Sequence, residues 1–398
     1  MRFHTGLLAC TLALAGAAQA SEAPKGKLLI AYYLATTAPA ERYVAPGALP
    51  ANKLTHLNYA FANIVDGEIV VGNPSVDVEG PDNFAQLRAL KQKLPKLKTL
   101  ISVGGWEWSG QFSNVALTPE SRAKFAQSGV RFIRTHGFDG IDIDWEFPVA
   151  GGKDENARRP DDKDNFTRLM QSLRDALDAA GREDKRHYLL TVAAGNNAAY
   201  LRNTDMAGVA RLLDWVNVMT YDMTGPWSQR SGHVAPLHRD PAMQAPDADP
   251  HNNVADVLDL FISAGVPPAR LVMGVPFYGY SWKGCTAEQG GQYQLCKGKG
   301  RGTWEEGALD YADLADHLID RDGYVRHWNE AAQVPYLFKP ATGEFITYDD
   351  PRSLKAKARF VKTRHLAGAM FWEITADKND ALLDALAAEL RPARATKR

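Results

Sequence analysis

Two patterns of hydrophobic and polar positions alternate along this chain. Short runs rich in β-branched and aromatic residues recur between longer segments whose apolar residues are three and four positions apart. The short runs are typical of buried strands, and the longer segments are typical of amphipathic helices. The helical pattern is clearest over 120–135, 162–180 and 254–264. The strand pattern predicts eight strands, at 28–34, 57–64, 99–103, 141–147, 189–194, 215–221, 271–278 and 368–374.

Eight strands that alternate with helices predict an α/β fold, a (β/α)8 TIM barrel. The alternation alone would equally allow an open, doubly wound sheet. No glycine-rich dinucleotide-binding loop follows the first predicted strand. The 398 residues leave room for more than a barrel, which typically takes about 250 residues.

The extra length is concentrated between the seventh and eighth predicted strands. Residues 281–348 contain glycine-rich turns, a helical pattern at 308–319 and strand-like runs at 334–338 and 344–346. A structureless loop of that size is uncommon in a compact domain. We therefore expect a small α+β subdomain at 281–348, inserted between barrel segments 21–280 and 349–398, on the barrel face where active sites lie. A helix at 380–390 is expected to end the fold.

The first 20 residues have the pattern of a secretory signal peptide. Arg2 provides a positive charge, residues 7–18 are apolar, and Ala18-Gln19-Ala20 is a small-residue cleavage motif before Ser21. The apolar run is too short to span a bilayer as a stable helix. A buried N-terminal helix is the alternative. The pattern predicts a secreted or periplasmic protein that has no membrane association after the signal is removed.

The composition is that of an ordinary soluble globular protein. Hydrophobic residues make up 45% and charged residues 23%, and the formal net charge is -1. No basic excess points to a nucleic-acid partner. The nine tryptophans are compatible either with a large core or with a surface on which flat ligands such as sugar rings stack.

Two cysteines remain after the predicted signal. Cys285 and Cys296 are close in sequence in a chain expected to reach an oxidising compartment, so a disulfide is the favoured interpretation and two free thiols are the alternative. Without a neighbouring histidine cluster, two cysteines do not make a metal site.

An acidic strand carries the clearest chemical signal. Side chains alternate between the two faces of a strand, so Asp142, Asp144 and Glu146 are expected to share the inward face of the fourth predicted strand. Carboxylates that share a site cannot all ionise, and at least one pKa must rise. A site for a hard cation or an inert acidic strand are the alternatives. The neighbouring Gly104-Gly105-Trp106 suits a sugar-binding cleft better than either.

At this point the chain resembles a known family. Asp139-x-x-Asp142-x-Asp144-x-Glu146 is similar to the D-x-x-D-x-D-x-E motif of family 18 glycoside hydrolases, the chitinases. The match continues on other predicted strands and spans the mature chain, through 31–33, Ser102-Val103-Gly104-Gly105, 219–222 and 371–373. The insertion is similar to the α+β subdomain of the deep-cleft branch of this family.

The resemblance implies specific roles. Glu146 would be the general acid and later the base, and Asp144 would hold the substrate's acetamido N–H and share a proton with a neighbouring acid. Tyr221 would donate its hydroxyl to the acetamido carbonyl, and Trp372 would lie beneath the distorted sugar. Asp142 and Ser102 would adjust the charge of the carboxylate stack from behind, and Asp139 would complete the motif. The pocket would be lined by Tyr32, Phe61, Met219, Asp222 and Tyr278. Neighbouring sugars would stack on Trp106, Trp227 and Trp108.

The chemistry that the resemblance implies is substrate-assisted. Family 18 departs from the usual two-carboxylate mechanism because the substrate's own acetamido oxygen is the nucleophile, giving an oxazolinium ion and a retained configuration. The expected partner is chitin or its oligosaccharides, acted on by a monomer without a cofactor. An N-glycan or peptidoglycan substrate, and a non-catalytic chitin-binding lectin, are the alternatives. Tyr280 stands where many members carry arginine, so sugar contacts on one side of the cut bond are expected to differ.

Overall fold

The computed structural model describes residues 26–35, 42–243, 249 and 251–391. The predicted signal peptide at 1–20 and the basic tail at 392–398 lie outside these ranges. In the part of the chain that is described, no helix has both the length and the apolar composition needed to cross a bilayer.

Eight parallel strands form a closed barrel. The strand order is β1-β15-β8-β7-β6-β5-β4-β2, and β1 also pairs with β2, which closes the ring. This closure confirms the (β/α)8 barrel and excludes the open sheet. The barrel strands are β1 (Leu28–Leu34), β2 (His56–Val65), β4 (Lys98–Gly104), β5 (Gly140–Asp144), β6 (Leu189–Ala194), β7 (Trp215–Val218), β8 (Leu271–Pro276) and β15 (Gly368–Trp372), and the short β3 (Glu68–Val70) extends β2 in antiparallel fashion.

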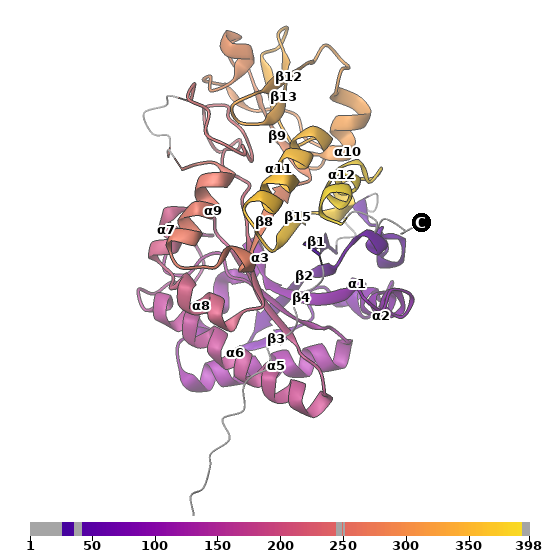
Figure 1. Cartoon of the computed structure of the whole chain (residues 1–398), viewed down its shortest axis with the longest axis vertical. Helices are drawn as coiled ribbons and strands as arrows, with labels where there is room; N and C mark the ends of the chain where they lie inside the picture. Colours follow the sequence, from indigo (N-terminus) through magenta and orange to yellow (C-terminus); the bar gives the residue numbers. More distant parts are fainter. Residues whose placement is uncertain (1–25, 36–41, 244–248, 250, 392–398) are drawn as a thin grey trace, which may run out of the picture.

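Helices cover the outside of the barrel, with α5 and α6 at the bottom of the view in Figure 1. The boundaries of α5 follow from its sequence: Thr118 and Ser121 form a capping box, Pro119 opens the first turn, and Gly137 ends the helix in the left-handed region. The helices are α1 (Pro74–Asp77), α2 (Asn83–Lys93), α3 (Gly105–Trp108), α4 (Phe112–Ala116), α5 (Pro119–His136), α6 (Asp162–Asp184), α7 (Ala198–Arg202), α8 (Met206–Leu212), α9 (Val254–Ser263), α10 (Tyr311–Asp313), α11 (Pro351–Thr363) and α12 (Ala381–Leu390).

The alternation of side chains along β5 explains how the barrel presents polar groups inside. Ile141 and Ile143 are fully buried in the hydrophobic core, and Trp145 stacks on Phe112 of α4 with ring centroids 5.4 Å apart. The intervening acids therefore point into the barrel. Asp142 lies in register there, with Ser102 of β4 on one side and Thr191 of β6 on the other.

A second, antiparallel sheet is inserted between β8 and β15. It lies at the top of Figure 1, above the barrel. Its strands are β9 (Tyr278–Lys283), β10 (Gly298–Lys299), β11 (Ala308–Asp310), β12 (Val325–Asn329), β13 (Val334–Lys339) and β14 (Glu344–Thr347).

The helix predicted at 308–319 begins later than expected. Residues 308–310 are strand β11, where Leu309 lies opposite Gly279 of β9, and the helix starts only at Tyr311 and continues through a π-helical turn at Leu314–Leu318. Tertiary pairing overrides the local helical preference here. Strand β12 was not expected either.

A buried ion pair joins the inserted sheet to the last part of the barrel. Lys357 of α11 lies 2.5 Å from Asp349, which follows β14, and neither side chain is exposed. Asp349 also accepts a hydrogen bond from Ser353 at 2.6 Å. The pair fixes the position at which the chain returns from the insertion to the barrel.

Candidate active site

Asp142 lies at the centre of a hydrogen-bonded layer inside the barrel. Its Oδ2 accepts from the hydroxyls of Tyr32 and Ser102, both at 2.8 Å, and its Oδ1 accepts from Thr191 at 2.6 Å and from Asn217 at 3.2 Å. Burial raises the pKa of Asp142, and these donors oppose the rise. Both carboxyl oxygens are thus fully engaged by protein donors, and a metal ion would have to displace them.

Asp144, two residues further along the same face, has the opposite surroundings. Its side chain is buried, and among the described residues its Oδ1 has no hydrogen-bond partner. Burial, and then the charges of Glu146 and Asp142, raise the pKa of Asp144 well above its usual value. Buried polar atoms are normally paired, so the free oxygen of Asp144 is suited to a group supplied by a ligand.

Glu146 is held by its backbone and not by its side chain. The chain leaves β5 after Asp144, and the Glu146 N–H donates to Ser109 Oγ at 2.8 Å. The Glu146 carbonyl accepts from Asn156 Nδ2 at 3.0 Å. Burial, and then the neighbouring charge of Asp222, raise the pKa of Glu146 to about 8. A carboxyl group with this pKa carries its proton at neutral pH and can act as a general acid.

Tyr221 and Asp222 lie in the turn after β7. Tyr221 is buried, and burial raises the pKa of its hydroxyl well above the usual value, so it stays an O–H donor. Asp222 has a left-handed backbone, with φ 56°. It accepts a hydrogen bond from the hydroxyl of Tyr278. Tyr280, the departure from the family pattern, lies against Tyr278 with ring centroids 5.4 Å apart, and its hydroxyl lowers the pKa of Asp222, the acid whose charge acts on Glu146.

Aromatic rings surround Trp372 at the end of β15. Its ring lies 5.7 Å from that of Tyr32 and stacks on Phe61 at 5.6 Å, measured between centroids. Phe61 also lies against Gly105, where a Cβ would come within 2.6 Å of the ring and where the backbone has φ 70°. Glycine at this position lets the ring approach the chain that follows β4. Met219, after β7, is half-buried.

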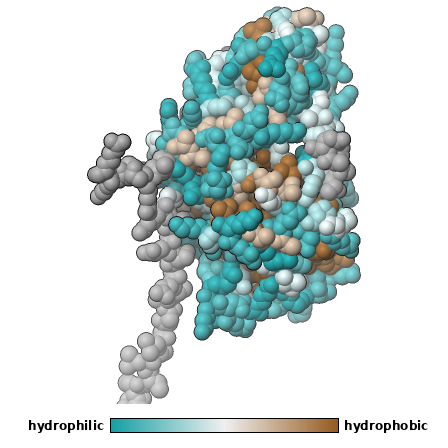
Figure 2. Space-filling view, turned by 90° about the vertical axis from the view of Figure 1, so that its right-hand side faces the viewer, coloured by the Kyte–Doolittle hydropathy of each residue, from teal (hydrophilic) through white to brown (hydrophobic). Residues whose placement is uncertain are grey.

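The three tryptophans expected on the cleft rim differ in exposure. Trp106 on α3 is 50% exposed and Trp227 in the loop after β7 is 63% exposed. Trp108 is less exposed and lies against Gly72, where a Cβ would come within 2.5 Å of its ring. Trp108 therefore packs against the chain, and the other two present their rings to solvent. Figure 2 shows one face of the molecule, mostly hydrophilic, with hydrophobic residues gathered around its middle.

Asp139, the first acid of the motif, lies apart from the others. It precedes β5, and its carboxylate pairs with Lys91 at 2.6 Å and with Arg186. Burial opposes ionisation, but Lys91 and the Thr99 N–H hold the pKa of Asp139 below its usual value. The structure places this acid at the amino end of β5, the end away from the barrel face where active sites lie, so its ion pairs stabilise the barrel and do not line the cleft.

Four polar residues of the site escaped the sequence prediction: Thr191, Asn217, Ser109 and Asn156. Thr191 and Asn217 are polar positions inside otherwise apolar strands. This pattern indicates that their side chains need a hydrogen-bond partner inside the barrel. Ser109 and Asn156 lie in turns and act through the Glu146 backbone. No periodic pattern reveals such contacts.

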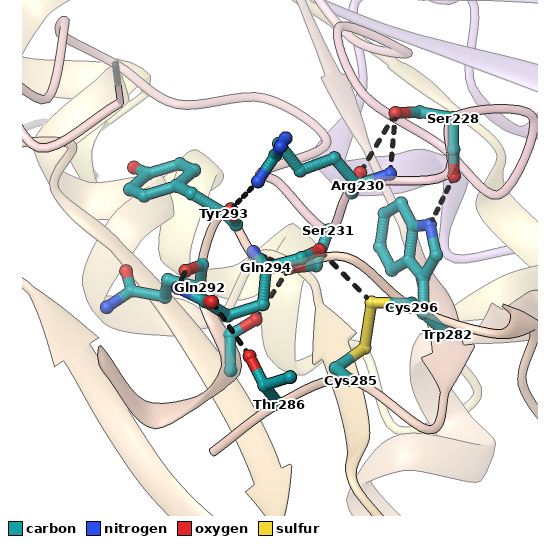
Figure 3. Close-up of a disulfide and its surroundings, with 11 residues drawn as sticks. Ser228, Arg230, Ser231, Trp282, Cys285, Thr286, Gln292, Tyr293, Gln294 and Cys296 are labelled. Atoms are coloured by element: carbon teal, nitrogen blue, oxygen red, sulfur yellow. Dashed lines mark hydrogen bonds between the residues drawn. A yellow bond between two sulfur atoms is a disulfide. The ribbon is translucent and has the colours of Figure 1, made fainter. Parts of the chain in front are cut away.

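Cys285 and Cys296 are joined by a disulfide in the inserted unit (Figure 3). The bridge closes a loop that contacts the segment after Trp227. Among the residues that the structure describes, no group of three or more His, Cys, Asp or Glu side chains is arranged to hold a metal ion.

A carboxyl acid of raised pKa stands beside a second buried carboxyl at the carboxyl end of a barrel strand, and aromatic rings suited to sugars gather at the carboxyl end of other barrel strands. These features define a glycoside hydrolase.

Comparison with known proteins identifies the family. The sequence model for "Glycosyl hydrolases family 18" matches residues 29–377. Chitinase A1 of Niallia circulans is 43% identical over 93% of this chain, which spans 59% of that protein's length. Chitinase B of Serratia marcescens is 33% identical over 84% of this chain and 76% of its own. The chain belongs to glycosyl hydrolase family 18.

Solved structures agree with this assignment. The structure described as chitinase ChiA74 from Bacillus thuringiensis superimposes with a TM-score of 0.88 at 38% identity, covering 94% of this chain and 71% of that one. A family 18 N-acetylglucosaminidase from Paenibacillus barengoltzii superimposes with a TM-score of 0.80, also at 38% identity, and covers 92% of this chain and 100% of that one.

Proposed function

We propose that this chain is a chitinase that hydrolyses β-1,4 bonds between N-acetylglucosamine units with retention of configuration. The observation that carries the proposal is that Oδ1 of buried Asp144, next to Glu146, has no hydrogen-bond partner in the part of the chain that the structure describes. A glycosidase with a protein nucleophile needs a second carboxylate that attacks carbon. Here the second carboxyl is suited instead to hold a polar group of the substrate, and the 2-acetamido N–H is such a group.

The first half of the reaction begins with Glu146 protonated. Its proton passes to the glycosidic oxygen, the bond from that oxygen to the anomeric carbon breaks, and the leaving sugar departs as an alcohol. The acetamido oxygen forms the new bond to the anomeric carbon, giving an oxazolinium ion. Asp144 accepts the acetamido N–H, and the Tyr221 hydroxyl donates to the acetamido oxygen, so both orient the group for attack.

The second half reverses the roles of the same residues. Glu146, now a carboxylate, accepts a proton from water, the water oxygen bonds to the anomeric carbon, and the acetamido oxygen is released. Two displacements at one carbon restore the original configuration. Glu146 returns to its protonated form for the next cycle, as microscopic reversibility requires.

Asp142 supports this cycle from below. Its engaged carboxylate lies two residues from Asp144 and is one of the charges that raise the pKa of that residue. When Glu146 loses its proton, Asp144 and Asp142 are the neighbours among which charge is redistributed. Tyr32 and Ser102, through their bonds to Asp142, set how much negative charge that layer carries.

The aromatic residues would bind successive sugars. Trp372, with Phe61 and Tyr32 against it, is placed to lie under the sugar at the cut bond, bordered by Met219. Trp106 and Trp227 are exposed rings on which neighbouring sugars would stack. Several rings of this kind favour chitin or its oligosaccharides over a single terminal sugar.

Two other functions are tested by the same experiment. One alternative keeps the chemistry and changes the chain that is cut. The enzyme would then act as an N-acetylglucosaminidase, as one of the similar structures is described, or would cut N-glycans or peptidoglycan. A lectin would bind and not cut, although Glu146 and Asp144 are both present. A product time course on the N-acetylglucosamine hexamer and on an N-glycan separates them: dimers and trimers from the hexamer support the proposal, whereas only monomer, only glycan cleavage, or no product contradicts it.

We propose further that the chain is exported, with cleavage before Ser21, and acts outside the cytoplasm as a monomer without a cofactor. The family relationship and the cysteine pair are compatible with export. Residues 281–348 would act as a subdomain that forms one wall of the cleft. Mass spectrometry of the mature N-terminus and light scattering of the purified protein test these points.

A further inference from the structure

The disulfide-closed loop 285–296 contacts the segment 228–231 through hydrogen bonds, and Figure 3 shows several residues of the two side by side. The Ser231 N–H donates to the Gln294 carbonyl at 3.0 Å, and the Gln294 N–H donates back to Ser231 Oγ at 3.0 Å. The Cys296 N–H donates to the Gln229 carbonyl at 2.9 Å. One of the two bridged cysteines therefore bonds directly to this segment.

Side chains strengthen the same contact. Arg230 Nη1 donates to the Tyr293 carbonyl at 2.9 Å, and Arg230 and Leu295 form an antiparallel bridge. Trp282 Nε1, from β9, donates to the Ser228 carbonyl at 2.9 Å. The loop and β9 thus fix the segment from both sides.

This segment follows directly on Trp227, the most exposed tryptophan of the rim. The indole of Trp227 is 63% exposed. Its ring meets that of Tyr280 edge-on at 5.3 Å and lies over Gly225. An exposed ring binds a sugar well only if its orientation is fixed beforehand, because ordering it on binding costs affinity. The next residues of the chain are where that order is imposed.

We propose that the Cys285–Cys296 loop is a positioning element for Trp227, which sets the affinity for long substrates that reach this ring. The inference rests on the proposed function, in which Trp227 stacks on a sugar beyond the cut bond. The bridge spans 11 positions in sequence, and such a closure restricts the conformations open to the loop. Without it, residues 291–296 have more freedom and hold 228–231 less firmly.

The test compares the Cys285→Ala, Cys296→Ala double variant with Trp227→Ala and with the triple variant. Stacking of a sugar on a fixed aromatic ring is worth a factor of about three to ten in affinity. We expect KM for the N-acetylglucosamine hexamer to rise by that factor in the double variant, with kcat unchanged. KM for a substrate too short to reach Trp227 should stay the same. The triple variant should be no worse than Trp227→Ala alone.

Hydrogen exchange of the Ser231 and Cys296 amides gives a readout that does not depend on substrate, and we expect both to lose protection when the bridge is absent. If the double variant does not fold, two other samples replace it: the Ser231→Ala variant with the bridge intact, and wild-type protein reduced after folding. Thiol labelling of the unreduced protein first establishes that the bridge is present.

Each result decides the proposal. Unchanged exchange, or lost protection with unchanged hexamer KM, overturns it. If Trp227→Ala leaves the hexamer KM unchanged, the ring binds no sugar and the proposed binding surface is wrong. This result can be recognised even if the hydrogen-exchange data are as expected. Additive effects in the triple variant would mean that the loop acts on another part of the cleft.

Discussion

Asp142 and Asp144 point into the barrel from the same strand, yet one carboxylate accepts four hydrogen bonds and the other has a buried oxygen that accepts none from the described residues. The difference comes from neighbouring strands. Asp142 lies level with Ser102 and Thr191, whereas Asp144 lies where β4 reaches Gly104, which has no side chain to donate. The barrel thus satisfies one acid completely and leaves an oxygen of the other available, which is why we propose that it binds the substrate.

The Glu146→Gln variant is expected to fold and bind ligand nearly as the wild type does. The amide keeps the shape of the side chain but cannot donate the proton, so kcat should fall by about a hundredfold to ten-thousandfold. Hydrolysis of a chromogenic N-acetylglucosamine oligomer measures the rate, and isothermal calorimetry with unmodified oligomer measures binding. Near-normal turnover would refute the assignment of the acid.

The Asp144→Asn and Asp142→Asn variants are expected to lower the rate and shift the pH profile. The carboxyl groups of Asp144 and Glu146 repel each other when both are charged, so removing the one at position 144 lets Glu146 ionise more easily and the alkaline limb should move to lower pH. Asp139→Asn is the matched control, because this acid belongs to the same motif but lies at the other end of the strand. Its profile should stay that of the wild type. Unchanged profiles in all three would show that the acids do not share protons.

The Asp222→Asn variant isolates the second cause of the raised Glu146 pKa. Activity needs protonated Glu146, so it should be lost as the pH rises through about 8. Without the negative charge of Asp222 the pKa of Glu146 falls, and the alkaline limb should move to lower pH. A pH profile of kcat checks this. A limb that stays in place, or moves to higher pH, would mean that Asp222 does not act on Glu146 by its charge.

The sequence predicted the barrel well because parallel strands are buried on both faces and so give apolar runs that are easy to find. Where those runs end was harder to predict. The expected strands 141–147 and 215–221 stop at Asp144 and Val218, since the Glu146 N–H bonds to Ser109 and the Tyr221 N–H bonds to the nearby Met219 carbonyl. The pattern of apolar residues continues into the turns that build the site.

The hydrogen bonds that set the pKa values of the site could not be predicted from the pattern of residues in the sequence. The partnership of Asp142 with Thr191 and Asn217 depends on strand register, which is fixed only when the barrel closes. The hydrogen bond from Tyr278 to Asp222 links segments far apart in the chain. Motifs indicate which acids are present, but tertiary contacts decide which of them is engaged and which is free.

The buried pair of Lys357 and Asp349 allows a test of the link between insertion and barrel. Lys357→Met leaves Asp349 buried without its cation, which should destabilise the fold by about 3–5 kcal/mol. Lys362→Met, on the same helix, removes a partner of Glu389 whose side chain is 43% exposed to solvent. That change should cost no more than about 1 kcal/mol. Urea unfolding measures both, and equal effects would mean that the buried pair is not structurally important.

The central claim is that the substrate's acetamido oxygen is the nucleophile, with Asp144 and Tyr221 holding that group. One proton NMR time course tests it, run on the N-acetylglucosamine hexamer, on its fully deacetylated counterpart and on cellohexaose, which share the same β-1,4 linkage. The account predicts that the acetylated hexamer alone is cut and that the β anomer appears first. Initial release of the α anomer, or comparable hydrolysis of the deacetylated chain, would show that a protein base or nucleophile does this work and would contradict the account.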